Sequence, residues 1–172
     1  MKRKLTIILS ALACMVAAAQ TPEDYHFSVK DNYVTWQLVY AAPIDTDAAL
    51  DYLLGSGNFA DVTDVSDGIS FTILPRSVDF AAAGFKRLSV PMYLVNYPMT
   101  AHGLLQVRDG RYRVTVDHVS FVDNPPMSLE LFALRKGGVF APLFVSGKAA
   151  FILDNDFTAL FTIPTETTEE DW

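Results

Sequence analysis

Three arginines surround one Asp-Gly dipeptide in the stretch LLQVRDGRYRVTVDHVSF, residues 104–121. Guanidinium groups form forked hydrogen bonds to carboxylates and phosphates, so Arg108, Arg111 and Arg113 are candidates for binding an acidic ligand, a glycan or a partner protein. The same residues also fit the solvated face of a hairpin, where each exposed ion pair contributes about 0.2–1 kcal/mol. We favour the solvated face, because the chain has 20 acidic residues that can neutralise its 13 Lys and Arg residues.

His102, two residues before this stretch, and Asp117 within it could form an oriented acid–base pair. The sequence has no nucleophile-elbow pattern and no recognisable serine or cysteine nucleophile to accompany them. His26 and His118 lack local metal-ligand spacing, and there is no HExxH motif. We therefore interpret His102 and Asp117 as a cross-strand hydrogen bond, and we predict no metal site, no cofactor and no catalytic residue.

Two further groups of side chains are given structural roles. Aspartates recur at positions 45, 47 and 51 and at 154 and 156, but the EF-hand pattern with its glycine is absent, so we predict helix caps and solvated turns rather than calcium ligands. The aromatic residues Trp36, Phe85, Tyr93 and Tyr97 could line a groove for a sugar or another apolar ligand. Core packing is the preferred interpretation of these rings.

The alternation of side chains predicts the hairpin that positions the arginines. A two-residue turn at Asp109-Gly110 pairs Arg108 with Arg111 and His102 with Asp117. One predicted face is apolar: Leu105, Val107, Tyr112, Val114 and Val116. The other is polar apart from Leu104: His102, Gln106, Arg108, Arg111, Arg113, Thr115 and Asp117. A slip of one residue would exchange the two faces, so the pattern itself fixes the register.

Other periodic segments surround this hairpin. Residues 33–40 alternate as a half-buried strand, residues 45–54 form a capped helix, and residues 59–74 form a second hairpin. Centring that second turn on Asp67-Gly68 pairs Val65 with Ser70. Residues 82–99 are predicted as an edge strand or a packed loop, 128–136 as a helix ended by two glycines, and 148–161 as a helix. Together these elements predict a single α+β domain over residues 20–163, with a curved antiparallel sheet and helices packed on one face.

The ends of the chain differ from this predicted domain. Residues 1–19 combine a basic start with an apolar run and small residues before Gln20, which predicts a secretory signal peptide. Its apolar run of about fifteen residues is short of the roughly twenty needed to cross a bilayer. The lone cysteine, Cys14, lies inside this segment in a poor lipobox, so we expect no lipid anchor. Residues 164–172 are predicted to be an acidic tail without regular structure.

Removal of the signal peptide would change the net charge. Three basic residues and no acidic residue would be lost, leaving ten basic against twenty acidic residues, so the net charge would pass from −7 to about −10. Phosphate binding needs a basic footprint, so this charge argues against nucleic acid as a partner and against an anionic membrane surface. The remaining sequence has no apolar run long enough for a transmembrane anchor.

The stretch Val107–Arg113, in which DGRYR closes an alternating strand behind a secretion signal, resembles a group of secreted Bacteroidetes proteins. The resemblance covers about residues 30–125. Those proteins carry a domain of unknown function with a fold similar to that of TATA-binding protein, which implies a curved antiparallel sheet with a helix on one side. The resemblance implies no established activity, cofactor or catalytic residue, and its likeness to TATA-binding protein is architectural only.

Two hypotheses for function follow. The preferred one is a non-enzymatic binding domain, exported to the periplasm or the cell surface, that binds an envelope protein or a glycan through its sheet face or through residues 82–99. The alternative is a small hydrolase or ligand-binding enzyme for an anionic substrate, using His102, Asp117 and the nearby arginines. Whether these side chains line a deep pocket or an open sheet discriminates between the two.

Overall fold

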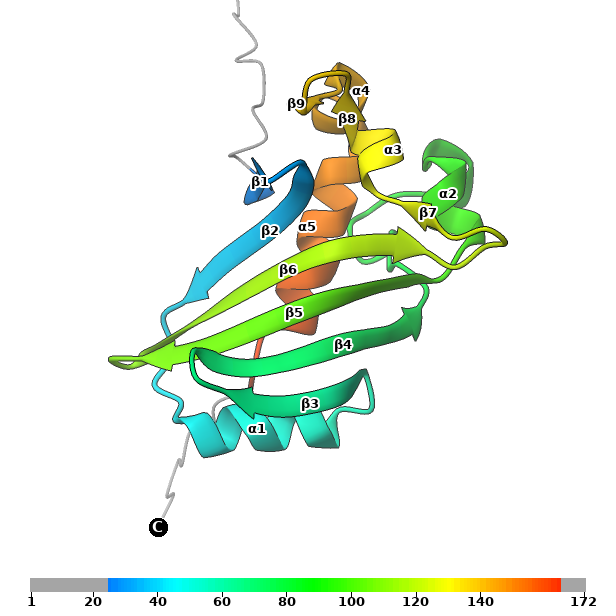
Figure 1. Ribbon diagram of the computed structural model, residues 1–172. Coiled ribbons are helices and arrows are strands. Elements are labelled where there is room, and N and C mark those ends of the chain that lie inside the picture. Colours follow the sequence, from blue (N-terminus) through cyan, green and yellow to red (C-terminus); the bar gives the residue numbers. More distant parts are fainter. Residues whose placement is uncertain (1–24, 165–172) are drawn as a thin grey trace, which may run out of the picture.

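The computed structural model describes residues 25–164. The predicted signal peptide with Cys14, and the predicted acidic tail apart from its first residue, lie outside the described residues. Within them the chain has an antiparallel sheet of strand order β1-β2-β6-β5-β4-β3, with β7 paired to β6 (Figure 1). The strands are β1 (Phe27–Lys30), β2 (Tyr33–Tyr40), β3 (Phe59–Val65), β4 (Gly68–Arg76), β5 (Met99–Arg108), β6 (Arg111–Phe121) and β7 (Met127–Ser128). The predicted α+β class is confirmed.

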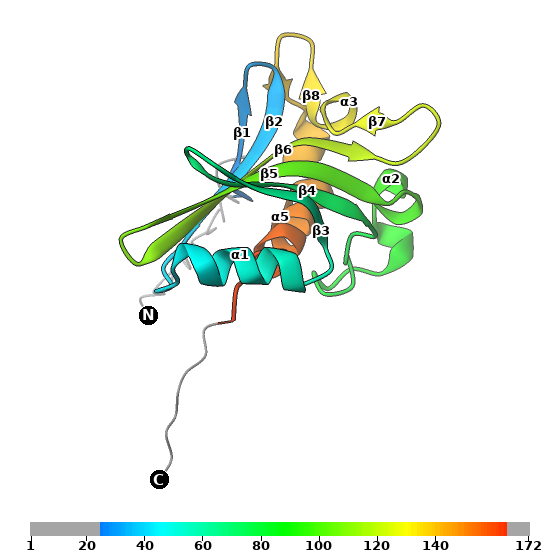
Figure 2. The same ribbon diagram turned by 60° about the horizontal axis from the view of Figure 1, so that its bottom comes forward.

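Two helices cover one face of this sheet. Both α1 (Thr46–Gly55) and α5 (Lys148–Leu160) lie on the same side of it, as Figure 2 shows. The core between sheet and helices includes Trp36 of β2, Tyr112 of β6 and Phe157 of α5, each at most 1% exposed. No described helix lies in front of the opposite face in Figure 1. That opposite face is called the outer face below.

Helix α1 forms where the sequence predicts it. The Asp45 side chain accepts a hydrogen bond from the backbone N–H of Ala48 at 2.8 Å, which satisfies one of the free donors of the first turn. Ala49 and Leu53 are fully buried, whereas Leu54 is 62% exposed, so the apolar stripe is narrower than the run of leucines indicates.

Three tyrosine hydroxyls form hydrogen bonds that connect the end of α5 to neighbouring elements. Tyr40, Tyr52 and Tyr112 donate to the backbone carbonyls of residues 158, 160 and 161, respectively. The last carbonyls of a helix have no backbone partner within the helix, so these hydroxyls satisfy acceptors at this end of α5, where the Thr158 carbonyl also accepts from the Thr162 hydroxyl. Burial raises the pKa of all three phenols above its ordinary value.

The aspartates at 154 and 156 correct the sequence analysis. We assigned them to helix caps or solvated turns, but both lie within α5 and contact residues of the strands or of the segment before β1. Asp154 accepts a hydrogen bond from the indole N–H of Trp36 at 2.8 Å, and His26 lies at the same distance from the same oxygen. Asp156 is 4% exposed and forms a two-pronged ion pair with Arg76 of β4. Their roles are to connect α5 to the strands.

The second hairpin has a different register from the predicted one. Val65 pairs with Gly68 rather than Ser70, and a further register shift between Ala60 and Thr63 leaves Phe59 paired with Ile73. The reason lies on the neighbouring strand, because a Cβ on Gly68 would lie 2.3 Å from the carbonyl oxygen of Leu105. Gly68 therefore allows β4 and β5 to approach closely, and it is not a central residue of the turn.

Two less periodic segments also differ from prediction. Residues 82–99 were predicted as an edge strand or a packed loop; they form no edge strand, and they contain a 3₁₀ turn, η2 (Arg87–Ser89), and a short helix, α2 (Met92–Asn96). The helix predicted at 128–136 is shorter, and its two glycines form the turn of a small hairpin. The elements here are α3 (Glu130–Ala133), β8 (Leu134–Arg135), β9 (Val139–Phe140) and α4 (Pro142–Val145). Within residues 25–164, no helix combines the length and apolar character needed to cross a membrane.

Candidate functional site

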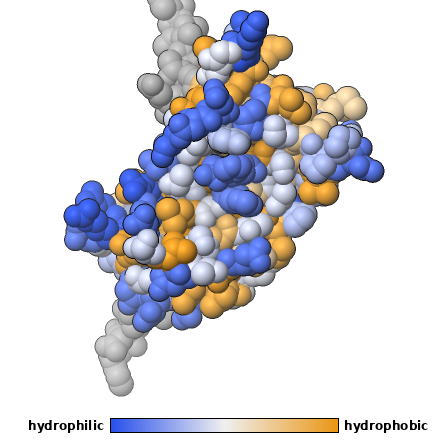
Figure 3. Space-filling view, viewed as in Figure 1, coloured by the Kyte–Doolittle hydropathy of each residue, from blue (hydrophilic) through white to orange (hydrophobic). Residues whose placement is uncertain are grey.

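The β5–β6 hairpin has the predicted register. Arg108 pairs with Arg111, Gln106 with Arg113 and His102 with Asp117. Tyr112, Val114 and Val116 are at most 1% exposed beneath the sheet, whereas both arginines of β6 are exposed. Figure 3 shows hydrophilic side chains gathered at the tip of this hairpin, at the left, and over the middle of the outer face. The hairpin therefore places the arginines near its tip, and His102 with Asp117 farther along the same outer face.

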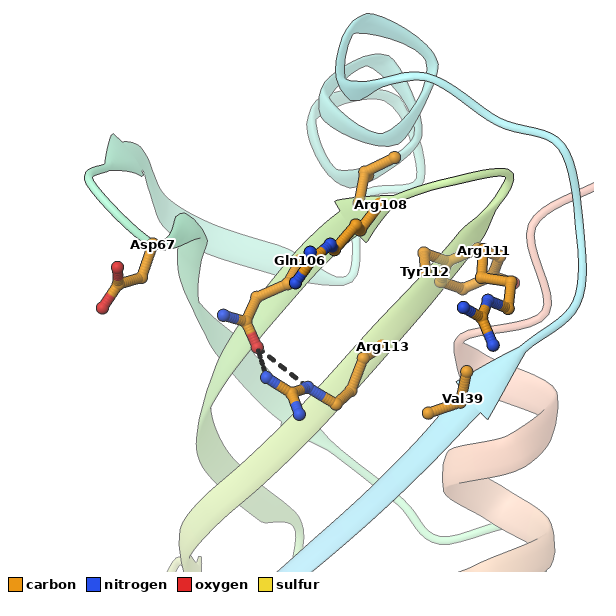
Figure 4. A pocket seen from close by; sticks show the side chains of 8 residues that line it. Val39, Asp67, Gln106, Arg108, Arg111, Tyr112 and Arg113 are labelled. Carbon is orange, nitrogen blue, oxygen red and sulfur yellow. Dashed lines mark hydrogen bonds between the residues drawn. The ribbon is translucent and has the colours of Figure 1, made fainter.

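The arginines line a shallow pocket on that face, with a volume of about 430 Å³. The side chains around it come from the hairpin, from Val39 of β2 and from Asp67 of the β3–β4 turn (Figure 4). In Figure 4 the Arg113 side chain points toward Gln106, and Arg111 lies beside Val39. Cationic groups on two strands thus border one open depression next to an exposed apolar side chain.

The arginines have fewer carboxylate partners than we expected for a solvated face on which acidic residues neutralise basic ones. Arg113 donates two hydrogen bonds to the amide oxygen of Gln106, from Nε at 2.9 Å and from Nη2 at 2.6 Å. Arg108 contacts the carboxylate of Asp109 at 3.3 Å, with 89% of its own side chain exposed. Arg111 has neither an ion pair nor a hydrogen-bonded side-chain partner within residues 25–164. Nearby carboxylates therefore neutralise only one of the three arginines in the described structure.

His102 and Asp117 are opposite one another, but the hydrogen bond expected between them is replaced by another. The Asp117 carboxylate lies 2.8 Å from Nδ1 of His118, its neighbour along the chain. Ring contacts extend the group: His102 lies 5.6 Å from His118 between centroids, and Tyr33 lies 4.4 Å from His118. His118 is the member of this cluster that sequence reasoning missed.

A β-bulge brings His118 to the outer face. The register shifts between the pair of Thr100 with Ser120 and the pair of His102 with Asp117, so two residues of β6 oppose one of β5. His118 has a φ of 51°, in the left-handed region that side chains other than glycine seldom adopt. Alternation is broken there, because neither Asp117 nor His118 is buried while the valines on both sides of this pair are.

Of the aromatic residues proposed for a groove, Trp36 is buried, and Phe85, Tyr93 and Tyr97 are partly buried against the core. Trp36 is fully buried against Phe157, with centroids 5.3 Å apart, and Tyr93 stacks on Phe132 at 4.0 Å. Burial also raises the pKa of Tyr93. Phe85 is in edge contact with a phenylalanine of α5 and lies 5.2 Å from the ammonium group of Lys148. The geometry agrees with core packing for these rings.

An apolar depression lies at the other end of the molecule, beside residues 82–99. It has a volume of about 680 Å³ and is formed by η2, α2, α3, α4 and the start of α5. Three of the side chains that line it are strongly exposed: Leu88, Leu131 and Leu143. The sequence assigned possible binding to residues 82–99 as well as to the sheet face. The depression on the sheet face differs from this one in being bordered by three arginines.

Comparisons with known proteins give one structural similarity. No protein-family model matches the chain, and no curated protein is similar to it in sequence. A solved structure that is similar to this chain is that of a DUF4468 family protein from Bacteroides ovatus, with a TM-score of 0.44 and 12% identity. The match covers 81% of this chain and 92% of that chain. This TM-score is too low to establish a shared fold, so the likeness to TATA-binding protein and the family resemblance stay predictions.

Proposed function

We propose that this chain is an exported, non-enzymatic binding protein that holds an anionic group of an envelope protein or a glycan on its outer face. Export to the periplasm or cell surface rests on the predicted signal peptide at residues 1–19. Binding rests on one observation. Arg111 is exposed beside Arg113 on a chain of net charge −7, and within the described residues no carboxylate pairs with it.

Electrostatics explain why an anion would bind there. Arg108 and Arg111 are directly opposite across the hairpin, and like charges in that position destabilise a strand pair. A carboxylate between them would remove this repulsion and gain forked hydrogen bonds. Gln106 occupies two donors of Arg113, which orients that guanidinium group and leaves its Nη1 free for a ligand.

The alternative of a hydrolase finds less support in the geometry. A general base must lie within hydrogen-bond reach of the proton that it abstracts, so an enzyme has to hold its substrate beside the catalytic histidine. Here the Asp117 carboxylate contacts His118 rather than His102, and both histidines are exposed on the open outer face. Binding without catalysis is therefore the function that we propose.

Affinity measurements with two carboxylate-rich probes test this function. The purified full chain is titrated with an oligoglutamate peptide, which represents an acidic protein segment, and with an oligogalacturonate, which represents an acidic glycan. We expect at least one probe to bind, and we expect the Arg111→Ala/Arg113→Ala double variant to weaken that binding at least tenfold. The matched control is Arg135→Ala, which removes an exposed arginine from the small β8–β9 hairpin.

Two results would contradict the proposed function. One is unchanged affinity in the double variant, which would place the anion elsewhere on the molecule. The other is the absence of binding to both probes at low ionic strength, where attraction between exposed charges is strongest. Pull-down from an envelope fraction with the wild-type chain and the double variant then identifies the natural partner.

A further inference from the structure

The bulge in β6 brings together a cluster of potential metal ligands that the local spacing of the sequence does not predict. His102 of β5 and the adjacent residues Asp117 and His118 of β6 each offer one ligand atom, and these three atoms lie within 4.8 Å of one another. The sequence predicts no metal site, because none of its histidines has local ligand spacing. The extra residue at the bulge supplies the proximity, since a regular strand would direct Asp117 and His118 to opposite faces.

We propose that His102, Asp117 and His118 form a binding site for a divalent transition-metal ion such as Zn²⁺. Two imidazoles and one carboxylate suit zinc, copper or nickel, whereas calcium and magnesium prefer sets of oxygen ligands. Ligand atoms bound to one zinc ion at about 2.0–2.2 Å lie at most about 4.4 Å apart. Small rotations, chiefly of the exposed His102 side chain, therefore bring the cluster to coordination distance.

Hydrogen bonding between Asp117 and His118 does not by itself explain this arrangement. Such a pair requires neither a second histidine on the facing strand nor a left-handed backbone at His118. Unusual backbone conformations of this kind cost of order 1–3 kcal/mol and concentrate at functional sites. Tyr33 packs on the His118 ring, with centroids 4.4 Å apart, and limits its rotation. Three protein ligands would leave a coordination position open for water or for a ligand atom from a partner.

Zinc titration of the full chain tests the site. The protein carries no polyhistidine tag, is first treated with a chelator and is then titrated with Zn²⁺ in a calorimeter. We expect one Zn²⁺ per chain, and at least tenfold weaker binding in each of His102→Ala, Asp117→Ala and His118→Asn. Asparagine is chosen at position 118 because it tolerates the left-handed backbone, so the bulge is retained when the imidazole is removed.

A matched histidine variant gives the control. His26→Ala removes a partly exposed histidine that also contacts an aspartate, so it should leave the affinity for Zn²⁺ unchanged. Wild-type affinity in His102→Ala and His118→Asn, or an equal loss in His26→Ala, would overturn the proposed site. Binding of Ca²⁺ as tight as that of Zn²⁺ would overturn the assignment to a transition metal. Addition of Co²⁺ should give a visible absorption band that the His118→Asn variant lacks.

Discussion

Asp156 of α5 receives hydrogen bonds from both terminal nitrogens of Arg76, so a buried ion pair joins the long helix to strand β4. The Asp156 side chain is 1% exposed, and the backbone N–H of Asp79 donates a third hydrogen bond to it at 2.9 Å. A charge removed from water in this way is tolerated because each oxygen has a partner. The pair therefore fixes α5 beneath the strands that carry the outer face.

The first prediction concerns this pair. Replacing Asp156 by alanine leaves the Arg76 guanidinium group partly buried without its counter-charge, and we expect the free energy of unfolding to fall by about 3–5 kcal/mol. Urea denaturation followed by circular dichroism measures the change. Asp51→Ala is the control, since Asp51 is exposed on α1 and its loss should cost less than about 0.5 kcal/mol. Equal stability of the two variants would contradict the role of the pair.

The second prediction concerns the close contact between Gly103 of β5 and the ring of Phe71. A Cβ at position 103 would lie 2.2 Å from two carbon atoms of that ring. The ring is held by Phe59 and Phe161, with centroids 5.1 Å and 5.6 Å away, so it has little room to move. We expect Gly103→Ala to lower the free energy of unfolding by about 1–3 kcal/mol.

Another glycine provides the control for Gly103. Gly55 ends α1 and has nothing within 4 Å of the position where a Cβ would be added. Gly55→Ala should therefore be neutral or stabilising by up to about 1 kcal/mol, because alanine favours the helix. If Gly103→Ala proved as stable as Gly55→Ala in thermal unfolding, the packing described for Phe71 would be wrong.

The third prediction concerns stability at high pH. Burial raises the pKa of Tyr40, Tyr52, Tyr93 and Tyr112, whereas tyrosines in an unfolded chain ionise near pH 10, as is usual for a phenol. A raised folded pKa means that the unfolded chain loses its protons first. The stabilisation is thus complete below about pH 10 and is lost as the pH rises above that value toward the raised folded pKa.

Phenolate absorbance measures this behaviour directly. Four of the seven tyrosines should remain neutral above about pH 10 while the chain is folded, and the free energy of unfolding should fall over the same pH range. In urea all seven should ionise together near pH 10. Ionisation of all seven at that pH in the folded chain, with constant stability, would refute the burial of these hydroxyls.

Local alternation was enough to predict the β5–β6 hairpin, since each residue's face follows from counting away from the turn. Counting away from the turn gave the wrong register for the β3–β4 hairpin. The close approach of Leu105 to Gly68 is a contact with a third strand, and the pattern of two strands does not contain it. His118 was missed although a signal was present. Val116 and Val119 are both apolar but three positions apart, which indicates an extra residue between them.

A second missed signal lies in α5. Asp156 falls four residues after Ile152 and four before Leu160, within the apolar stripe of the helix. A carboxylate at such a position predicts a buried partner, because an unpaired buried charge is too costly. The partner itself could not be predicted, since Arg76 is 80 residues away along the chain. Long-range pairs of this kind depend on how the sheet and the helix meet.

The most direct test of the outer face as an anion-binding surface is an NMR titration of the arginine side chains. The Nε–H signals of the full chain are followed while the carboxylate probe that binds is added. We expect the signals of Arg111 and Arg113 to shift in a saturable manner while that of Arg135 stays in place. Unmoved signals of Arg111 and Arg113 at probe concentrations that saturate the chain would contradict binding at the outer face.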